Sequence, residues 1–256
     1  MEKMIGLPIF LLALIIEIYA FPPPPSLLPP GHVLVSLIKF RLTDLSREND
    51  NAQDASQKGS NDASPTCPKT LSSITDSKNG NFYLFNDDNV WTLNNRTVIS
   101  GPKKISQVFP NGPDYVNATV TSRDLTVLLE ERTLYGYNQD EVTGEFKVAK
   151  GFPAKLHELV LFFPVAAFPL SNGSIILLSH FNAFATYNLF DNRPSLLNDK
   201  DVFFPGLPKD LASGIPENRV SDDFYMLFTK SQVYKYDNRL GEIVHAQPLS
   251  SYLVCK

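Results

Sequence analysis

Residues 224–237 read Phe-Tyr-Met-Leu-Phe-Thr-Lys-Ser-Gln-Val-Tyr-Lys-Tyr-Asp. Two runs rich in aromatic and apolar residues flank a short polar stretch, which is the pattern of two antiparallel strands joined by a tight turn. In this stretch Phe228 is followed six residues later by the aromatic Tyr234. The same spacing occurs three times upstream, in Phe85 and Trp91, Leu129 and Tyr135, and Leu178 and Phe184. The sequence therefore predicts four copies of one β-hairpin.

A short segment with a small second residue precedes each hairpin. The four segments start at Ser72, Asn117, Val165 and Ala212, which are 45, 48 and 47 residues apart. Their second residues are Ser73, Ala118, Ala166 and Ser213. The first three repeats end alike, with Phe109-Pro110, Phe152-Pro153 and Leu207-Pro208. Small side chains would allow four strands to meet at one axis.

Each repeat predicts a sheet of three or four strands that cannot bury both of its faces alone. Four such sheets packed radially can do so. We therefore predict an all-β domain, a four-bladed β-propeller over residues 67–255. The blades are expected at about 67–112, 113–156, 157–208 and 209–255, and residues 191–201 and 205–216 are expected to be long rim loops.

The composition narrows the class of protein. The chain has 256 residues, of which 43% are apolar, so it is long enough to bury a sizeable core. Its 20 prolines and 13 glycines favour short strands and turns over long helices. The formal net charge is −4, which excludes a basic protein that binds nucleic acid through bulk electrostatics.

The first twenty residues have the pattern of a secretory signal peptide. Lys3 provides the positive start, residues 5–16 form an apolar run, and Ala20 is a small residue suited to cleavage. The run is too short for a membrane-spanning helix, which needs about 20 apolar residues, and no later segment is long and apolar enough. We therefore expect a secreted, extracellular protein with signal peptide 1–20. The alternative is an uncleaved signal anchor.

Residues 21–66 are predicted to be a disordered leader. They begin with prolines, which favour an extended chain, and end with a polar stretch whose composition does not support a packed core. Between these parts, residues 32–42 are mainly apolar and could add an edge strand, form a short helix or bind a partner. The folded domain is expected to begin near Cys67.

Secretion would allow the two cysteines to form a disulfide and three sequons to be glycosylated. Cys67 and Cys255 are the two cysteines of the chain, and an oxidising compartment would allow them to pair. The alternatives are two free thiols, or pairing of Cys255 with another chain. N-glycosylation sequons begin at Asn95, Asn117 and Asn172, of which Asn95 and Asn172 lie in turn-like sequence and are the better candidates.

The repeats and the two cysteines together resemble the hemopexin-like domain, the four-bladed β-propeller of hemopexin, vitronectin and the C-terminal part of matrix metalloproteinases. In that family each blade opens with an Asp-Ala-Ala/Val-Phe type motif. Residues 165–168, Val-Ala-Ala-Phe, and residues 117–120, Asn-Ala-Thr-Val, fit this opening best, and residues 224–237 fit the family's hairpin. Cys67 and Cys255 stand where the family has one cysteine before the first blade and one at the end of the fourth. The resemblance therefore implies a disulfide that joins the first and last blades.

The resemblance also implies what the centre of the domain would bind. Family propellers hold ions in a central channel through main-chain carbonyls, and the matching positions are Ser72, Asn117, Val165 and Ala212. The family's Asp is absent at all four, so Ca²⁺ or another cation would be bound without that negative charge. A channel position for Asn117 competes with its use as a sequon. Heme binding is disfavoured because the chain has one propeller and no evident histidine pair.

The sequence contains no catalytic constellation, so we predict that the protein is not an enzyme. His157-Glu158 begins like a zinc-protease helix, but the second histidine is missing, and there is no Gly-x-Ser-x-Gly motif. The leading hypothesis is a secreted module that binds an extracellular protein or a matrix component. The alternatives are a carrier of heme or a metal ion, and a truncated metalloproteinase-related regulator without a catalytic domain. The sequence carries no signal for an oligomeric state.

Overall fold

The computed structural model describes residues 66–255. The predicted signal peptide (1–20) and residues 21–65 of the predicted leader lie outside the described residues. The described chain is all-β, with three helices of four residues each. These helices are α2 (Ile105–Val108), α3 (Lys200–Phe203) and α4 (Leu249–Tyr252).

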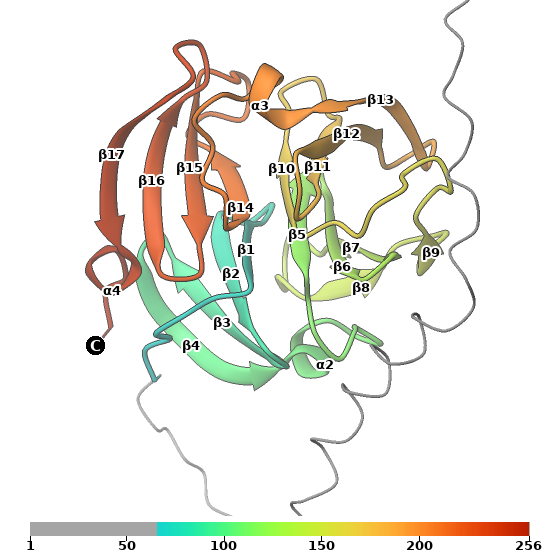
Figure 1. Cartoon of the computed structure of the whole chain (residues 1–256). Helices are drawn as coiled ribbons and strands as arrows, with labels where there is room; N and C mark the ends of the chain where they lie inside the picture. The colour runs from blue at the N-terminus through green and yellow to red at the C-terminus, as the bar shows by residue number, and fades with distance from the viewer. Residues whose placement is uncertain (1–65, 256) are drawn as a thin grey trace, which may run out of the picture. The chain divides into compact units, whose positions relative to one another are not determined.

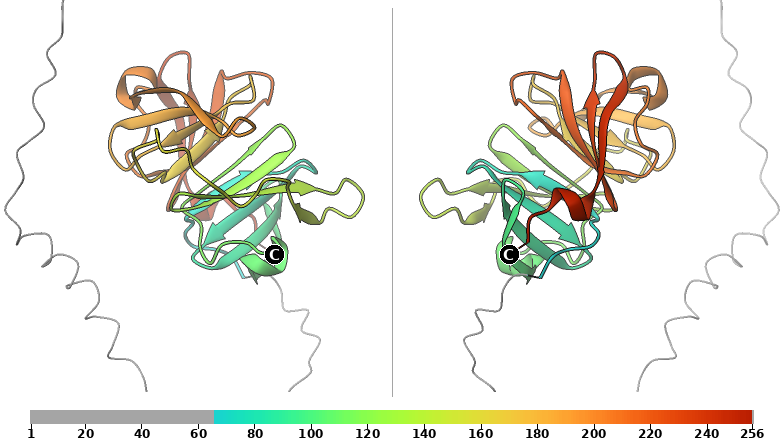
Figure 2. Two further views of the ribbon diagram at one scale, coloured as in Figure 1. Left: turned by 90° about the vertical axis from the view of Figure 1, so that its right-hand side faces the viewer. Right: turned by 90° about the vertical axis from the view of Figure 1, so that its left-hand side faces the viewer.

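The strands form four antiparallel units in chain order (Figure 1). Sheet 1 contains β1 (Ser73–Asp76), β2 (Asn81–Asn86), β3 (Asn89–Asn94) and β4 (Thr97–Lys104). Sheet 2 contains β5 (Ala118–Ser122), β6 (Leu125–Glu130), β7 (Thr133–Gln139), β8 (Phe146–Val148) and β9 (Ala154–Lys155). Sheet 3 contains β10 (Ala166–Pro169), β11 (Ile175–Leu178), β12 (Ala183–Asn188) and β13 (Arg193–Asp199). Sheet 4 contains β14 (Leu211–Pro216), β15 (Phe224–Thr229), β16 (Gln232–Asp237) and β17 (Glu242–Pro248). Sheets 1 and 2 lie in the lower half of both views in Figure 2, and sheets 3 and 4 lie in the upper half.

The first strand of each sheet lies at the centre of the arrangement in Figure 1. The small residues predicted for this purpose, Ser73, Ala118, Ala166 and Ser213, are completely buried. Hydroxyl groups join these strands across the centre. Ser73 Oγ lies 2.8 Å from Thr119 Oγ1 and Thr75 Oγ1 lies 3.0 Å from Thr121 Oγ1, so β1 and β5 run in the same direction. Ser213 Oγ donates to the carbonyl of Ile74, which connects sheet 4 to sheet 1.

Sheets 3 and 4 differ from the separate blades that the sequence predicts. Strands β10 and β14 pair in parallel through Ala167 and Ser213, which makes one continuous eight-stranded sheet. The small side chains at this position allow the two backbones to come within hydrogen-bonding distance. Elsewhere among residues 66–255, the sheets are not joined by strand pairing, so the hydrogen-bonded ladders do not form a ring.

The four predicted hairpins are confirmed, and their registers explain the six-residue spacing. In three sheets the aromatic residue pairs with the residue that directly precedes the apolar one. These pairs are Trp91 with Leu84, Tyr135 with Leu128, and Tyr234 with Leu227. In sheet 3 a longer turn makes Phe184 pair with Leu178 itself. The aromatic rings of Trp91 and Phe184 are buried, and those of Tyr135 and Tyr234 are half-buried.

The two predicted rim loops contain regular secondary structure. The predicted loop at residues 191–201 contains β13 and the start of α3, and the predicted loop at 205–216 contains β14. Nearly every residue of β13 is exposed and Pro194 lies within it, so the strand lacks the apolar alternation by which a half-buried strand is recognised. Its position is fixed by pairing with β12.

A hydrophobic core fills the space between each pair of consecutive sheets, including the last and the first. Segments that leave one sheet for the next supply side chains to these cores. Phe109 lies between sheets 1 and 2, Phe152 packs against the core of sheets 2 and 3, and Leu207 packs against that of sheets 3 and 4. Leu249, Tyr252 and Leu253 take this role between sheets 4 and 1. The recurring Phe-Pro and Leu-Pro endings therefore place one large side chain between neighbouring sheets.

The two ends of the described chain meet beside sheet 1. Cys67 and Cys255 form a disulfide across a sequence separation of 188 residues, with their Cα atoms 5.7 Å apart. The backbone of Val254 adds two hydrogen bonds to sheet 1: its amide donates to the carbonyl of Arg96 (2.8 Å), and its carbonyl accepts from the amide of Val98 (2.9 Å). The predicted pairing of the cysteines is thus present, with non-covalent contacts around it.

Candidate functional site

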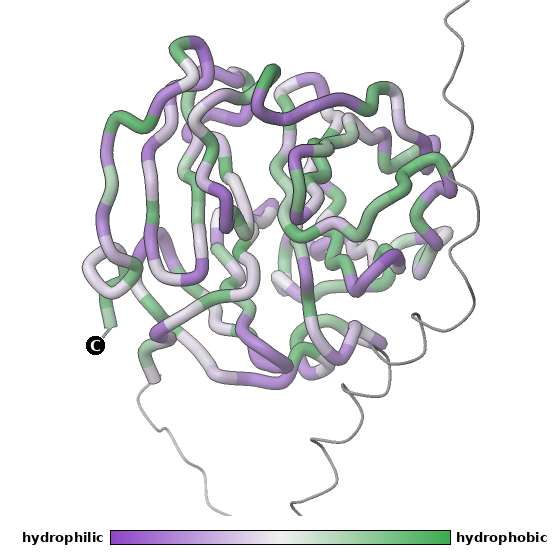
Figure 3. The backbone as a smooth tube through the Cα atoms, in the orientation of Figure 1, coloured by the Kyte–Doolittle hydropathy of each residue, from purple (hydrophilic) through white to green (hydrophobic). Residues whose placement is uncertain are grey.

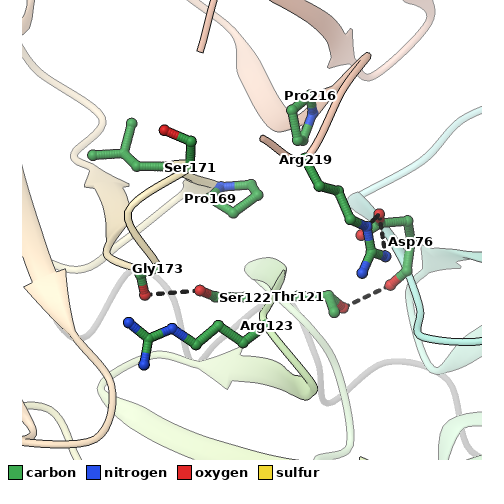
Figure 4. Close-up of a pocket in the computed structure, with 10 residues that line it drawn as sticks. Asp76, Thr121, Ser122, Arg123, Pro169, Ser171, Gly173, Pro216 and Arg219 are labelled. Atoms are coloured by element: carbon green, nitrogen blue, oxygen red, sulfur yellow. Dashed lines mark hydrogen bonds and ion pairs between the residues drawn. The ribbon is translucent and has the colours of Figure 1, made fainter. Parts of the chain in front are cut away.

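A central cavity of about 110 Å³ lies where the first strands of the four sheets end (Figure 4). Asp76 ends β1, Thr121 and Ser122 end β5, Pro169 ends β10, and Pro216 ends β14. The turns that follow these strands add Arg123, Ser171, Gly173 and Arg219 to the lining. All four sheets therefore contribute to one cavity, and two guanidinium groups and one carboxylate supply its charge.

The carboxylate of Asp76 is held by Arg219 from sheet 4. Arg219 Nε lies 3.0 Å from Asp76 Oδ2, and Nη2 also donates to this oxygen and to the carbonyl of Ser77 (3.0 Å). The hydroxyl of Thr121 donates to the main-chain carbonyl of Asp76 (2.6 Å). Asp76 is 8% exposed, whereas about half of the Arg219 side chain is open to solvent. This ion pair connects the last sheet to the first.

Polar contacts continue around the cavity from sheet to sheet. Lys78 lies 3.3 Å from Asp124 and joins sheets 1 and 2. Ser122 Oγ donates to the carbonyl of Gly173 (2.8 Å) and joins sheets 2 and 3. Ser171 N donates to Asp222 Oδ1 (2.8 Å) and joins sheets 3 and 4. With Arg219 and Asp76 between sheets 4 and 1, these contacts surround the cavity and hold its turns in place.

Burial raises the pKa of Asp76, and this effect exceeds the opposing attraction of Arg219. The folded chain therefore binds this proton more readily than the unfolded chain, in which the ordinary value is 3.8. When the pKa of an acid is higher in the folded chain than in the unfolded chain, the acid stabilises the fold most at low pH. This contribution is lost as the pH rises from the pKa of the unfolded chain through that of the folded chain. We expect the free energy of unfolding of the wild type, minus that of Asp76→Asn, to decrease as the pH rises through this window.

Urea unfolding of both proteins at a series of pH values from about 3 to 7 measures this difference. Asp76→Asn removes the titrating group, so the other groups cancel between the two proteins. A difference that increases with pH would show that the charge of Arg219, not burial, controls Asp76.

The four predicted channel positions lie at the opposite ends of the first strands. The amides of Ser72, Asn117 and Val165 each donate to a carbonyl at the end of the second strand of their own sheet. The carbonyl of Ala212 accepts from Ser73 Oγ (3.4 Å), and the side-chain oxygen of Asn117 accepts from the amide of Glu131 (2.6 Å). Neither contact occupies the main-chain carbonyl of Ser72, Asn117 or Val165, so binding of a cation by the four predicted carbonyls stays a prediction.

The other predicted site residues lie in different places. Asn95 is exposed in the turn between β3 and β4, and Asn172 is exposed in the turn between β10 and β11. Asn117 is half-buried. Glycosylation at these sequons stays a prediction.

Two further features of residues 66–255 are relevant to function. No group of three or more His, Cys, Asp or Glu side chains is arranged to hold a metal ion in this part of the chain. Within the same residues, no helix combines the length and the hydrophobicity needed to cross a membrane.

The central cavity and its charged residues were not predicted from the sequence. Asp76 carries one available signal, since it is an acidic residue at the end of an otherwise neutral buried strand. Its partner Arg219 is 143 residues away in a polar loop, and no local pattern connects the two.

Four packed antiparallel sheets around a common centre define an all-β repeat protein. A protein-family model described as Hemopexin matches residues 71–114. The chain is 30% identical over 155 residues to "Matrix metalloproteinase-C" of Caenorhabditis elegans, in an alignment that covers 60% of this chain and 26% of that protein. The chain thus spans about a quarter of the length of this curated relative. These two matches confirm the predicted resemblance to the hemopexin-like family.

Several solved structures of plant proteins have a similar fold. An albumin of Cicer arietinum showing hemagglutination has a TM-score of 0.59 at 16% identity, with 72% of this chain and 95% of that chain covered. The seed albumin LS24 of Lathyrus sativus has a TM-score of 0.59 at 12% identity, with 73% and 96% covered. A Cicer arietinum lectin with two metal binding sites has a TM-score of 0.55 at 14% identity, with 65% and 86% covered. At these identities the likeness concerns the fold alone.

Proposed function

We propose that this chain is a secreted, non-enzymatic hemopexin-like module that binds an extracellular protein or a matrix component. The observation that carries the proposal is the match of residues 71–114 to the Hemopexin family model, since the family resemblance implies a binding domain. The four-sheet scaffold supports it by presenting turns from all four sheets around one cavity.

The proposal includes a four-bladed propeller as the scaffold. Hydrophobic cores between all consecutive sheets support it, including the core between sheets 4 and 1. The Cys67–Cys255 disulfide and the Arg219–Asp76 ion pair support it further, because both connect the end of the repeat array to its beginning.

Production in secretory cells tests both parts of the function. We expect the protein to appear in the medium with residue 21 as its first residue, because signal cleavage follows Ala20. Crosslinking of this protein in its native extracellular fluid, followed by mass spectrometry, is expected to capture an extracellular protein that also binds in a two-component assay. The same chain after reduction and unfolding is the control. Retention in the cell would contradict secretion, and equal capture by the unfolded control would contradict specific binding.

The similarity to a metalloproteinase favours a second candidate function, a regulator of such a protease. A regulator that binds outside the active site would change cleavage of a large protein substrate and leave cleavage of a short peptide unchanged. Equal effects on both substrates, or none on either, would contradict this function.

Binding of a cation stays a prediction, and transport of heme, which the sequence disfavours, stays the alternative. A bound ligand stabilises the folded state by mass action, so Ca²⁺ would raise the Tm relative to EDTA. Hemin would shift its Soret band on addition of the protein.

A further inference from the structure

A groove between sheets 2 and 3 opens beside the central cavity and is separate from it. Its volume is about 410 Å³. Leu125, Phe152, Leu189 and Phe190 give it an apolar floor, and Arg123 and Lys150 lie at its rim. Arg123 lines both the groove and the central cavity.

The floor of the groove is fixed by packing, whereas one aromatic ring is open to solvent. Leu125 and Leu189 are buried. The ring of Phe152 occupies the space that a side chain at residue 136 would need, since a Cβ on Gly136 would lie 2.5 Å from it. Phe190 is 59% exposed. The groove therefore offers a preformed apolar surface with an accessible ring, which is the composition of a site for an apolar side chain.

The rim carries positive charge without an acidic partner. Among residues 66–255, no carboxylate lies within ion-pair distance of Arg123 or Lys150. Asp124, the acidic residue of the lining, lies 3.3 Å from Lys78, which also pairs with Glu141 at 2.7 Å. Since the whole chain has a net charge of −4, this local excess of positive charge runs against the average of the molecule and favours an acidic ligand.

Arg123 is held in this position against its backbone preference. Its φ is 54°, a left-handed conformation that glycine adopts more readily. In the turn between β10 and β11, a residue with positive φ is indeed a glycine, Gly173, with a φ of 88°. The guanidinium lies over the ring of Phe190, 5.3 Å from its centroid, and Nη2 donates to the carbonyl of Asn172 (3.2 Å). A strained residue with an available charge, held over an exposed ring, is a candidate for binding.

We propose that this groove binds an extended peptide segment of a partner protein in which an Asp or Glu lies next to a bulky apolar side chain. The apolar side chain packs against Phe190 and Leu189, and the carboxylate accepts hydrogen bonds from Arg123 and Lys150. Charge-assisted hydrogen bonds of this kind are about twice as strong as neutral ones. This inference rests on the proposed function and names the chemistry that the partner presents.

Selection of displayed random dodecapeptides on the full secreted chain tests the inference. We expect the selected peptides to contain an acidic residue beside Leu, Ile, Phe or Trp. Binding of one selected peptide, measured by fluorescence anisotropy, is expected to weaken about tenfold in the variant Arg123→Gly with Lys150→Gln. Glycine suits the left-handed backbone at residue 123, so this variant should fold, which its Tm will verify. Lys209→Gln removes an exposed charge with no ion-pair partner elsewhere in the described chain and should leave binding unchanged.

Exchange of the acidic residue of the selected peptide for its amide completes a double-mutant cycle. The exchange should weaken binding to the wild type and have no further effect on the double variant. Failure to select acidic peptides, or equal binding of a selected peptide by the two proteins, would overturn the inference. The crosslinking experiment distinguishes the groove inference from the proposed function. Capture of the same partner by the double variant would overturn the groove inference alone. Lack of capture by the wild type would overturn the proposed function.

Discussion

Replacement of Cys67 and Cys255 by serine is expected to lower the free energy of unfolding by about 2–5 kcal/mol. The disulfide spans a sequence separation of 188 residues, so it restricts nearly the whole unfolded domain, and the chain-entropy model gives roughly 5 kcal/mol as an upper figure for such a loop. The variant should stay folded, because Leu249, Tyr252 and Leu253 remain buried against sheet 1. Urea unfolding of the two proteins measures the difference.

Reduction of the wild type is the matched control for this prediction. A reducing agent should lower the stability of the wild type to that of the double serine variant and leave the variant itself unchanged. A difference below about 0.5 kcal/mol between the oxidised wild type and the variant, the size typical of surface substitutions, would show that the non-covalent contacts hold the two ends together without the disulfide.

Phe109→Ala is expected to destabilise the domain by about 3–5 kcal/mol. The ring is completely buried between sheets 1 and 2. It lies 4.4 Å from the ring of Phe146 and 5.2 Å from that of Tyr137 in sheet 2, and 5.6 Å from those of Tyr83 and Phe85 in sheet 1, as measured between centroids. These rings are held by separate sheets, so the space left by Phe109 cannot readily close. Urea unfolding measures the effect.

Phe181→Ala provides the control for loss of a phenyl ring. Phe181 is 79% exposed in the turn between β11 and β12, so its removal should change the free energy of unfolding by less than about 0.5 kcal/mol. A cost below about 1 kcal/mol for Phe109→Ala would mean that sheets 1 and 2 move together to fill the space.

The inner part of the fold was predictable because its signals are local and repeated. The six-residue spacing from Phe85 to Trp91 reflects one hairpin geometry in sheets 1, 2 and 4, and it also occurs in sheet 3, where the turn is longer. The small residues that start with Ser73 reflect one crowded centre. The Phe-Pro ending at Phe109 marks a ring placed between two sheets. Each of these patterns has one physical cause that recurs along the chain, so the repeats reinforce one another.

The outer strands and the candidate site could not be predicted in this way. β13 is exposed and therefore has no apolar period to detect. Asp76 and Arg219 meet only because sheet 4 packs against sheet 1. Arg123 lies at a turn position with a left-handed backbone, which glycine, asparagine and aspartate adopt more readily, so the residue type gives no sign of this turn. The hydrophobic segment between β9 and β10, visible in Figure 3, contains the buried Val160 next to Leu161, which is 86% exposed.

The disulfide also determines how the domain would respond to mechanical tension. A pull applied to the chain before Cys67 and after Cys255 would pass through two cysteines whose Cα atoms are 5.7 Å apart. The covalent link would carry the load, and the four sheets between them would stay outside the line of force. In an extracellular setting, the domain could therefore be stretched at both of its ends without unfolding, and reduction of one bond would transfer the whole load to the sheets.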